Sequence, residues 1–272
     1  MEKICVNSFS LSRELPNYLF PQYGGDKITI LEFPKICVEE IGLNNIELCQ
    51  MQFPSVEMDF IEKMKESLKD SNVNVTNICV DIGTTSEPNP EKRKEEFEII
   101  KRWFSIAKYL GSPSIRVNPD SPLPRAKIDS TEDALQRAIY GYKELAVIAR
   151  EIGVKLLIEN HGPGMTTNPD NIIKIIEEVG PDIMKTLPDL GNAILFPAEI
   201  REEGIRKMSK YASIIHAKTV PNEVGEKFLK PFMDIVKKTG FDGFYSLELP
   251  PMGKYDQREG IRNLLAIVRS LI

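Results

Sequence analysis

Histidine is scarce in this chain, which has only two among 272 residues. No G-x-S-x-G turn and no G-x-x-x-x-G-K-[ST] loop occurs, so no motif favours a serine hydrolase or a P-loop nucleotide site. No run of 18 or more apolar residues exists, which argues against a transmembrane helix. Basic residues are not in excess, because the net charge is −5 and the pI is near 5.4. That balance argues against an electrostatic nucleic-acid binder.

The cysteines lack the spacing of a metal or redox motif. Cys5, Cys37, Cys49 and Cys79 form no C-x-x-C pair, and three of them lie inside apolar runs. We therefore expect reduced, buried thiols in a cytoplasmic protein. The first six residues already follow a strand pattern, which leaves no room for a signal peptide. This also predicts a cytoplasmic protein that is not attached to a membrane.

Strand-like and helix-like segments alternate along the whole chain. The apolar runs predict eight strands, at residues 4–8, 45–49, 74–82, 114–118, 155–160, 183–189, 212–218 and 243–249. Residues 28–41 have near-helical apolar spacing that Pro34 should interrupt. Helices are predicted at 56–69, 90–110, 131–152 (starting at Ser130 or Thr131), 169–180, 197–210, 226–239 and 256–271.

Eight strand-then-helix units predict a parallel sheet with helical crossovers. In about 270 residues they fit a closed (β/α)₈ barrel that forms a single domain over residues 1–272. The alternative is an open, doubly wound sheet. The barrel is favoured because polar residues collect at the carboxyl end of nearly every strand and not at one crevice.

The segment Ile158-Glu159-Asn160-His161-Gly162 carries the strongest local signal for chemistry. It ends an apolar run and precedes a turn. Residues two apart in a strand face the same side, so Glu159 and His161 should project together. A buried carboxylate needs a partner, and a metal ion would be one. The other histidine, His216, likewise ends an apolar run, residues 212–215.

Polar residues at the expected strand ends form one larger set. They are Asn7, Glu47, Asp81, Arg116, Asn118, Glu159, His161, Asp189, Asn192, His216, Lys218 and Glu248. The last four strands place at their innermost positions Glu159, Asp189, His216 and Glu248.

Three converging carboxylates would repel one another, and a divalent cation would remove that repulsion. Three oxygen ligands and one imidazole suit Mn²⁺, Mg²⁺, Co²⁺ or Fe²⁺, with Zn²⁺ also compatible. Ion-paired carboxylates lining an ordinary barrel mouth are the alternative.

The segments LLIENHG, LPDLGN, IIHAK and GFYSLEL, in this order, resemble motifs of the sugar phosphate isomerase/epimerase family, the xylose-isomerase-like barrels. GSPSIRVN resembles the fourth strand of that family. The similarity spans essentially the whole chain, and the ordered set is more specific than any one motif. It implies a (β/α)₈ barrel with one divalent metal held by Glu159, Asp189, His216 and Glu248.

Two positions depart from the ketose 3-epimerase branch of that family. Asn192 stands where a histidine typically follows the metal-binding aspartate, and residues 219–222 lack the downstream arginine. The apurinic-endonuclease branch uses many histidines for several metals, so two histidines argue against DNA repair. The resemblance therefore favours a sugar or polyol substrate more than any one reaction.

The expected chemistry is proton transfer next to a carbonyl. Glu159 or Glu248 would remove the proton to give an enediolate, and its return would complete an epimerisation or an isomerisation. Loss of a hydroxyl from the same species would make the protein a dehydratase, such as a keto-inositol lyase. A non-catalytic sugar-binding barrel is a third possibility, and homo-oligomer formation stays open.

Further residues are candidates for holding the substrate or its anionic group. They are His161, Asn192, Lys218 and Arg116. Three of them have a structural alternative: His161 could orient a ligand carboxylate, Lys218 could lie in solvent at the rim, and Arg116 could pair with a barrel carboxylate such as Glu47.

Overall fold

A computed structural model describes residues 2–120, 131–162, 164–219, 225–252 and 255–272. Its strands are β1 Ile4–Asn7, β2 Asn45–Cys49, β3 Asn74–Val80, β4 Ser114–Val117, β5 Lys155–Glu159, β6 Met184–Leu187, β7 Ile214–Lys218 and β8 Phe244–Glu248. Its helices are α1 Phe33–Ile36, α2 Met58–Asp70, α3 Pro90–Leu110, α4 Glu132–Ile152, α5 Pro169–Val179, α6 Arg201–Ser209, α7 Glu226–Lys238 and α8 Gln257–Leu271.

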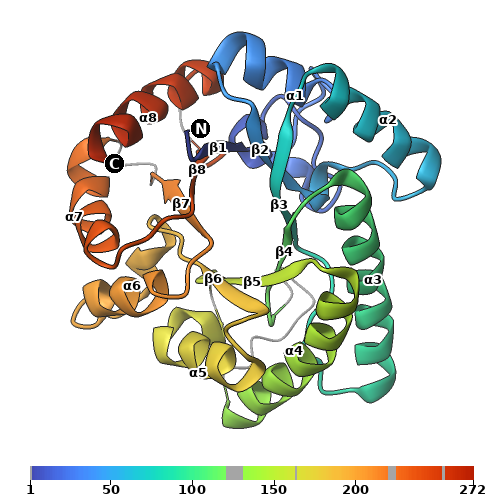
Figure 1. Ribbon diagram of the computed structural model, residues 1–272, viewed down its shortest axis with the longest axis vertical. Helices are drawn as coiled ribbons and strands as arrows, with labels where there is room; N and C mark the ends of the chain where they lie inside the picture. The colour runs from blue at the N-terminus through green and yellow to red at the C-terminus, as the bar shows by residue number, and fades with distance from the viewer. Residues whose placement is uncertain (1, 121–130, 163, 220–224, 253–254) are drawn as a thin grey trace.

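The strands form a parallel barrel that the helices surround (Figure 1). Their order is β6-β5-β4-β3-β2-β1-β8-β7. Two isolated bridges, Thr186 to Ala212 and Asp189 to His216, join β6 to β7 and nearly close the ring. The predicted (β/α)₈ barrel is therefore confirmed, and the open sheet is excluded. That residues 1–272 form a single domain stays a prediction.

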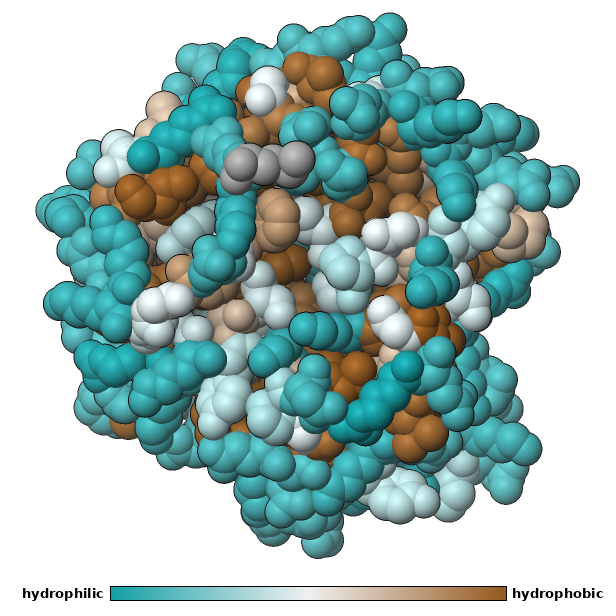
Figure 2. Space-filling model, in the orientation of Figure 1, coloured by the Kyte–Doolittle hydropathy of each residue, from teal (hydrophilic) through white to brown (hydrophobic). Residues whose placement is uncertain are grey.

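The helices bury one face against the barrel. In α5 the buried residues, spaced as one helical stripe requires, are Pro169, Ile172, Ile175, Ile176 and Val179. The predicted start and end of α3 are confirmed. The side chain of Asn89 accepts hydrogen bonds at its start, and Gly111, with φ of +82°, ends it. Thr131 caps α4, while Ser130 lies outside the described residues. Hydrophilic residues cover most of the periphery (Figure 2).

Two segments differ from the predicted elements. Residues 28–41 give only the short helix α1 followed by a π-helical turn, Cys37–Ile41. The strand expected at 183–189 ends at Leu187, because Pro188 has no N–H to donate to the ladder. The Pro188 carbonyl still accepts a hydrogen bond of 2.9 Å from the backbone N–H of His216. This contact keeps Asp189 beside β7. Within the described residues, no helix is long and apolar enough to cross a bilayer.

Candidate active site at the carboxyl ends of the strands

The structure brings the four predicted metal ligands together around one ring atom. Nδ1 of His216 lies 3.0 Å from Oε2 of Glu248, 3.4 Å from Oε1 of Glu159 and 3.5 Å from Oδ2 of Asp189. All four side chains are almost completely buried. They come from β5, β7, β8 and the segment after β6, so the barrel geometry alone accounts for their meeting.

The donor atoms fit a divalent cation. Ligand atoms of Glu159, Asp189 and His216 all lie within 4.8 Å of one another. Asp189 Oδ2 and His216 Nδ1 are buried and have no partner with hydrogen-bond geometry among the described residues. Such atoms are costly to bury unless something pairs with them. Two carboxylate oxygens and an imidazole nitrogen, with Glu248 beside them, form a set that Mn²⁺, Fe²⁺, Co²⁺, Mg²⁺ and Zn²⁺ can all accept.

Backbone and amide contacts fix the position of Asp189. Its N–H donates to Oδ1 of Asn160 at 2.7 Å, and its carbonyl accepts from Nδ2 of Asn160 at 2.8 Å. Its Oδ1 accepts from the N–H of Asn192 at 2.8 Å. One carboxylate oxygen is thus tied to the loop, while Oδ2 points to the ligand cluster.

The other imidazole nitrogen of His216 faces a carboxylate outside the four-ligand set. Nε2 lies 2.8 Å from Oε2 of Glu47, the middle residue of β2. Glu47 is completely buried. Arg116 does not form the ion pair with Glu47 that is the alternative to substrate binding. Its Nη1 lies 2.5 Å from Asp81 Oδ1, and its Nε lies 3.1 Å from Glu159 Oε2.

The surrounding charges set the ionisation of the site in the metal-free protein. Burial alone would raise the pKa of Glu159, but the charge of Arg116 and the contact with His216 hold that pKa well below its usual value. Burial would likewise raise the pKa of Glu248, but Lys218 and His216 lower it to about 2. Burial raises the pKa of Asp189, and Lys218 only partly offsets this. Glu47 and Glu248 outweigh burial and raise the pKa of His216.

Lys218 and Asn192 also reach the ligand cluster. Nζ of Lys218 lies 2.7 Å from Oε1 of Glu248 and 3.3 Å from Oδ2 of Asp189, and its side chain is 16% exposed. Nδ2 of Asn192 donates to Oε1 of Glu159 at 3.4 Å. His161 is half-buried, and its backbone N–H donates to Oγ1 of Thr166. The structure thus places Lys218 and Asn192 against the ligands, and a contact of any of the three with substrate stays a prediction.

Polar residues of the first strands take part in the cluster, although the sequence did not show how. Nδ2 of Asn7 contacts Glu47 at 2.9 Å and Glu248 at 3.2 Å. Asp81 is buried and paired with Arg116. Asn7, Glu47 and Asp81 all belonged to the strand-end polar set. That position was therefore the available signal for them.

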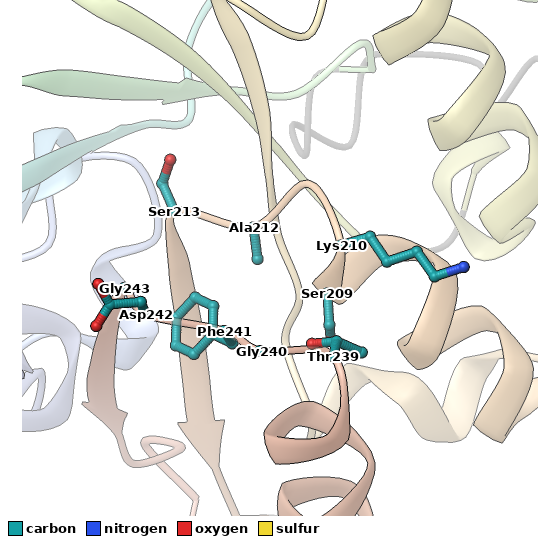
Figure 3. Close-up of a pocket in the computed structure, with 9 residues that line it drawn as sticks. All are labelled: Ser209, Lys210, Ala212, Ser213, Thr239, Gly240, Phe241, Asp242 and Gly243. Atoms are coloured by element: carbon teal, nitrogen blue, oxygen red, sulfur yellow. The ribbon is translucent and has the colours of Figure 1, made fainter.

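A pocket elsewhere in the molecule is not part of this site. Its cavity of about 390 Å³ is formed by the segments before β7 and β8 (Figure 3). Those segments are at the amino ends of the strands, whereas the ligand cluster is at the carboxyl ends. Phe241 and Asp242 contribute to it, and Lys210 points away from them. The residues that line this pocket include no histidine or cysteine, and none of them belongs to the ligand cluster.

Residues 37–271 match the family described as Xylose isomerase-like TIM barrel. The chain belongs to this family. No curated protein matches the chain significantly by sequence.

Solved structures show the same fold at low sequence identity. The structure of L-ribulose 3-epimerase is 15% identical with a TM-score of 0.76, over 100% of this chain and 94% of that one. A xylose isomerase-like TIM barrel protein from Mycobacterium smegmatis, in complex with magnesium, is 19% identical with a TM-score of 0.73, over 100% and 97% of the two chains. The IolI protein with a bound zinc atom is 17% identical with a TM-score of 0.74, over 99% and 97%.

Proposed function

We propose that this protein is a divalent-metal-dependent isomerase or epimerase of a sugar, a sugar phosphate or a related polyol. The observation that carries the proposal is the convergence of Glu159, Asp189 and Glu248 on Nδ1 of His216. Arg116 and Lys218 pair with Glu159 and Glu248, but burial and the neighbouring carboxylates still raise the pKa of Asp189. A divalent cation would neutralise the negative charge that remains. Two structural neighbours contain magnesium or zinc, and a third is a sugar epimerase, which supports the same assignment.

The four side chains would hold the cation, and a glutamate among them would also act on the substrate. When bound, the cation would supply Lewis-acid activation of a carbonyl and an adjacent hydroxyl. A glutamate beside it would take the proton from the carbon next to the carbonyl. Delivery of a proton by the other glutamate to the opposite face gives an epimer, and return of the proton by the first glutamate to the neighbouring carbon gives an isomer.

The two glutamates are not equivalent as bases. Oε2 of Glu159 lies against the buried guanidinium of Arg116, which cannot give up its charge. Oε1 of Glu248 lies against Lys218, whose side chain is partly exposed and whose four-carbon stem is of a flexible type. A substrate can displace the lysine more easily than the arginine. We therefore assign proton transfer first to Glu248 and treat Glu159 mainly as a ligand.

Three residues are assigned to the substrate. Lys218 would donate to a substrate oxygen or phosphate after leaving Glu248, and Asn192 would donate to a hydroxyl near Glu159. His161 lies two residues beyond Glu159 and would face the substrate beside the cation. We assign Arg116 to positioning Glu159 and Asp81, because it is buried and forms ion pairs with both carboxylates.

Solvent hydrogen exchange tests the proposal. The protein is loaded with Mg²⁺ and incubated in D₂O with ketoses, ketose phosphates, keto-inositols and hydroxypyruvate, and the products are followed by NMR. We expect deuterium at the carbon next to a carbonyl, and Glu248→Gln should abolish it. Lys230→Met, on the surface of α7, is the control and should exchange as the parent does. Net loss of water would assign the protein to the lyases. No exchange across the panel with Mg²⁺, Mn²⁺, Co²⁺ or Zn²⁺ would contradict the proposal.

A further inference from the structure

Both carboxylate oxygens of Glu47 accept several hydrogen bonds. Its Oε2 accepts from Asn7 Nδ2 at 2.9 Å, Ser246 Oγ at 2.6 Å and His216 Nε2 at 2.8 Å. Its Oε1 accepts from Asn77 Nδ2 at 2.7 Å and from Cys79 Sγ at 3.3 Å. These donors come from β1, β3, β7 and β8, so four strands fix one carboxylate on β2.

This saturation argues against a metal ion on Glu47 itself. Glu47, Cys79 and His216 have ligand atoms close enough to form a second metal site. Both oxygens of Glu47, however, already accept hydrogen bonds from neutral amides or hydroxyls, and these donors would have to turn away from a cation. Nε2 of His216 would also have to lose the hydrogen that it shares with Glu47. The contacts favour an acceptor role over a ligand role.

A histidine that binds a metal through one nitrogen usually donates from the other, and the acceptor fixes the ring. At His216 the two nitrogens face different groups. Among the carboxylates that the structure describes, Nε2 faces Glu47 alone, whereas Nδ1 faces Glu159, Asp189 and Glu248. Exchanging the two nitrogens would require the imidazole ring to rotate by half a turn, although less than 2% of the residue is exposed.

We propose that Glu47 is a positioning residue that holds the Nε2–H of His216 and so directs the Nδ1 lone pair to the cation. Glu47 does not touch the cation or the substrate and acts through the imidazole. The inference rests on the proposed metal site, but not on the identity of the substrate or the reaction. It also gives a reason for a buried carboxylate that the four-ligand set leaves unexplained.

Nitrogen NMR of the unmutated protein tests the orientation directly. The protein is labelled with ¹⁵N-histidine and loaded with Zn²⁺, which is diamagnetic. With two histidines there are only two imidazole spin systems, and His161→Asn assigns them. We expect Nε2 of His216 to carry a slowly exchanging proton and Nδ1 to shift on metal binding. A protonated Nδ1 with a metal-shifted Nε2 would overturn the proposal.

Substitution of the acceptor tests its effect on affinity. Glu47→Gln keeps the side-chain shape and one acceptor oxygen but removes the charge. We expect calorimetry to show about 10- to 100-fold weaker Mn²⁺ binding, with faster solvent exchange of the His216 Nε2 proton in the zinc form. Thr76→Val is the matched control, because it removes a buried strand hydrogen bond, Oγ1 to the Ile46 carbonyl at 3.0 Å, without touching His216. It should bind Mn²⁺ within about twofold of the parent.

The outcomes separate this inference from the proposed function. Equal Mn²⁺ affinity and an unchanged Nε2 proton in Glu47→Gln would show that Glu47 does not position the ring. If Glu47→Gln does not fold, as judged by its circular dichroism and thermal transition, the orientation measured in the unmutated protein still decides. Metal bound through Nδ1 without turnover of any sugar would support the inference while contradicting the proposed function. A parent protein that binds no metal would contradict both.

Discussion

Nε of Arg116 lies 3.1 Å from Oε2 of Glu159, and both side chains are buried on neighbouring strands. The same guanidinium reaches Asp81 at 2.5 Å. Arg116→Met would leave two buried carboxylates without their cation, so we expect it to lower the free energy of unfolding of the metal-free protein by about 3–5 kcal/mol. Urea unfolding at pH 7 measures this change.

A surface arginine provides the comparison for that loss. Arg102 pairs with Glu57 at 2.8 Å, but both side chains are largely exposed. We expect Arg102→Met to cost at most about 1 kcal/mol. If Arg116→Met costs no more than Arg102→Met, the buried pair does not have the structural role that we assign to it.

Lys218 competes with the cation for the same oxygens. Its ammonium lies 2.7 Å from Glu248 and 3.3 Å from Asp189. Removing a positive charge this close to two ligands should tighten Mn²⁺ binding by about tenfold or more, even at a high effective dielectric constant. We therefore expect Lys218→Met to bind Mn²⁺ more tightly while losing turnover. Calorimetry of Lys218→Met beside Lys230→Met checks this, and weaker binding in the first variant would contradict it.

Asp189 should destabilise the metal-free protein at neutral pH. Burial and the charges of Glu248 and Glu159 raise its pKa, whereas Lys218 opposes them. A carboxyl whose folded pKa is raised costs stability when ionised, and the cost disappears as pH falls below its unfolded pKa, about 3.9. We expect EDTA-treated Asp189→Asn to be more stable than the parent at pH 7, with a gap that narrows toward pH 4.

Urea unfolding of both proteins across that pH range measures the gap. The backbone contacts of residue 189 with Asn160 are retained in the variant, so the comparison isolates the charge. An Asp189→Asn protein that is less stable than the parent at pH 7, by an amount that does not change with pH, would rule out this account of Asp189.

The fold was predictable because its signals are local and repeated. The alternation of strand and helix patterns, with caps such as Asn89 and ends such as Gly111, required no knowledge of distant contacts. The shortened strand at Pro188 and the π-helical turn at Cys37–Ile41 were not predicted in detail. Both depend on how the local backbone is satisfied by its tertiary neighbours.

The four candidate ligands were found because each ends an apolar run in the second half of the barrel. For the polar side chains of the first four strands, the sequence did not predict which residues they contact. Glu47 sits beside a register shift between Ile46 and Glu47 in the pairing of β2 with β3. A shift of one residue decides which side chains a carboxylate meets, and no sequence pattern marked it. For this reason Arg116 was considered with Glu47, although it pairs with Asp81 and Glu159.

The most direct test of the metal site is calorimetric titration of Mn²⁺ into EDTA-treated protein at pH 7, with the parent, Asp189→Asn and His216→Ala. Elemental analysis of the protein as purified accompanies the titration. We predict one cation per chain for the parent and at least about 100-fold weaker binding for both variants, while Glu178→Gln on the surface of α5 binds as the parent does. A parent that binds no divalent cation, or variants that bind it as tightly as the parent, would contradict the account.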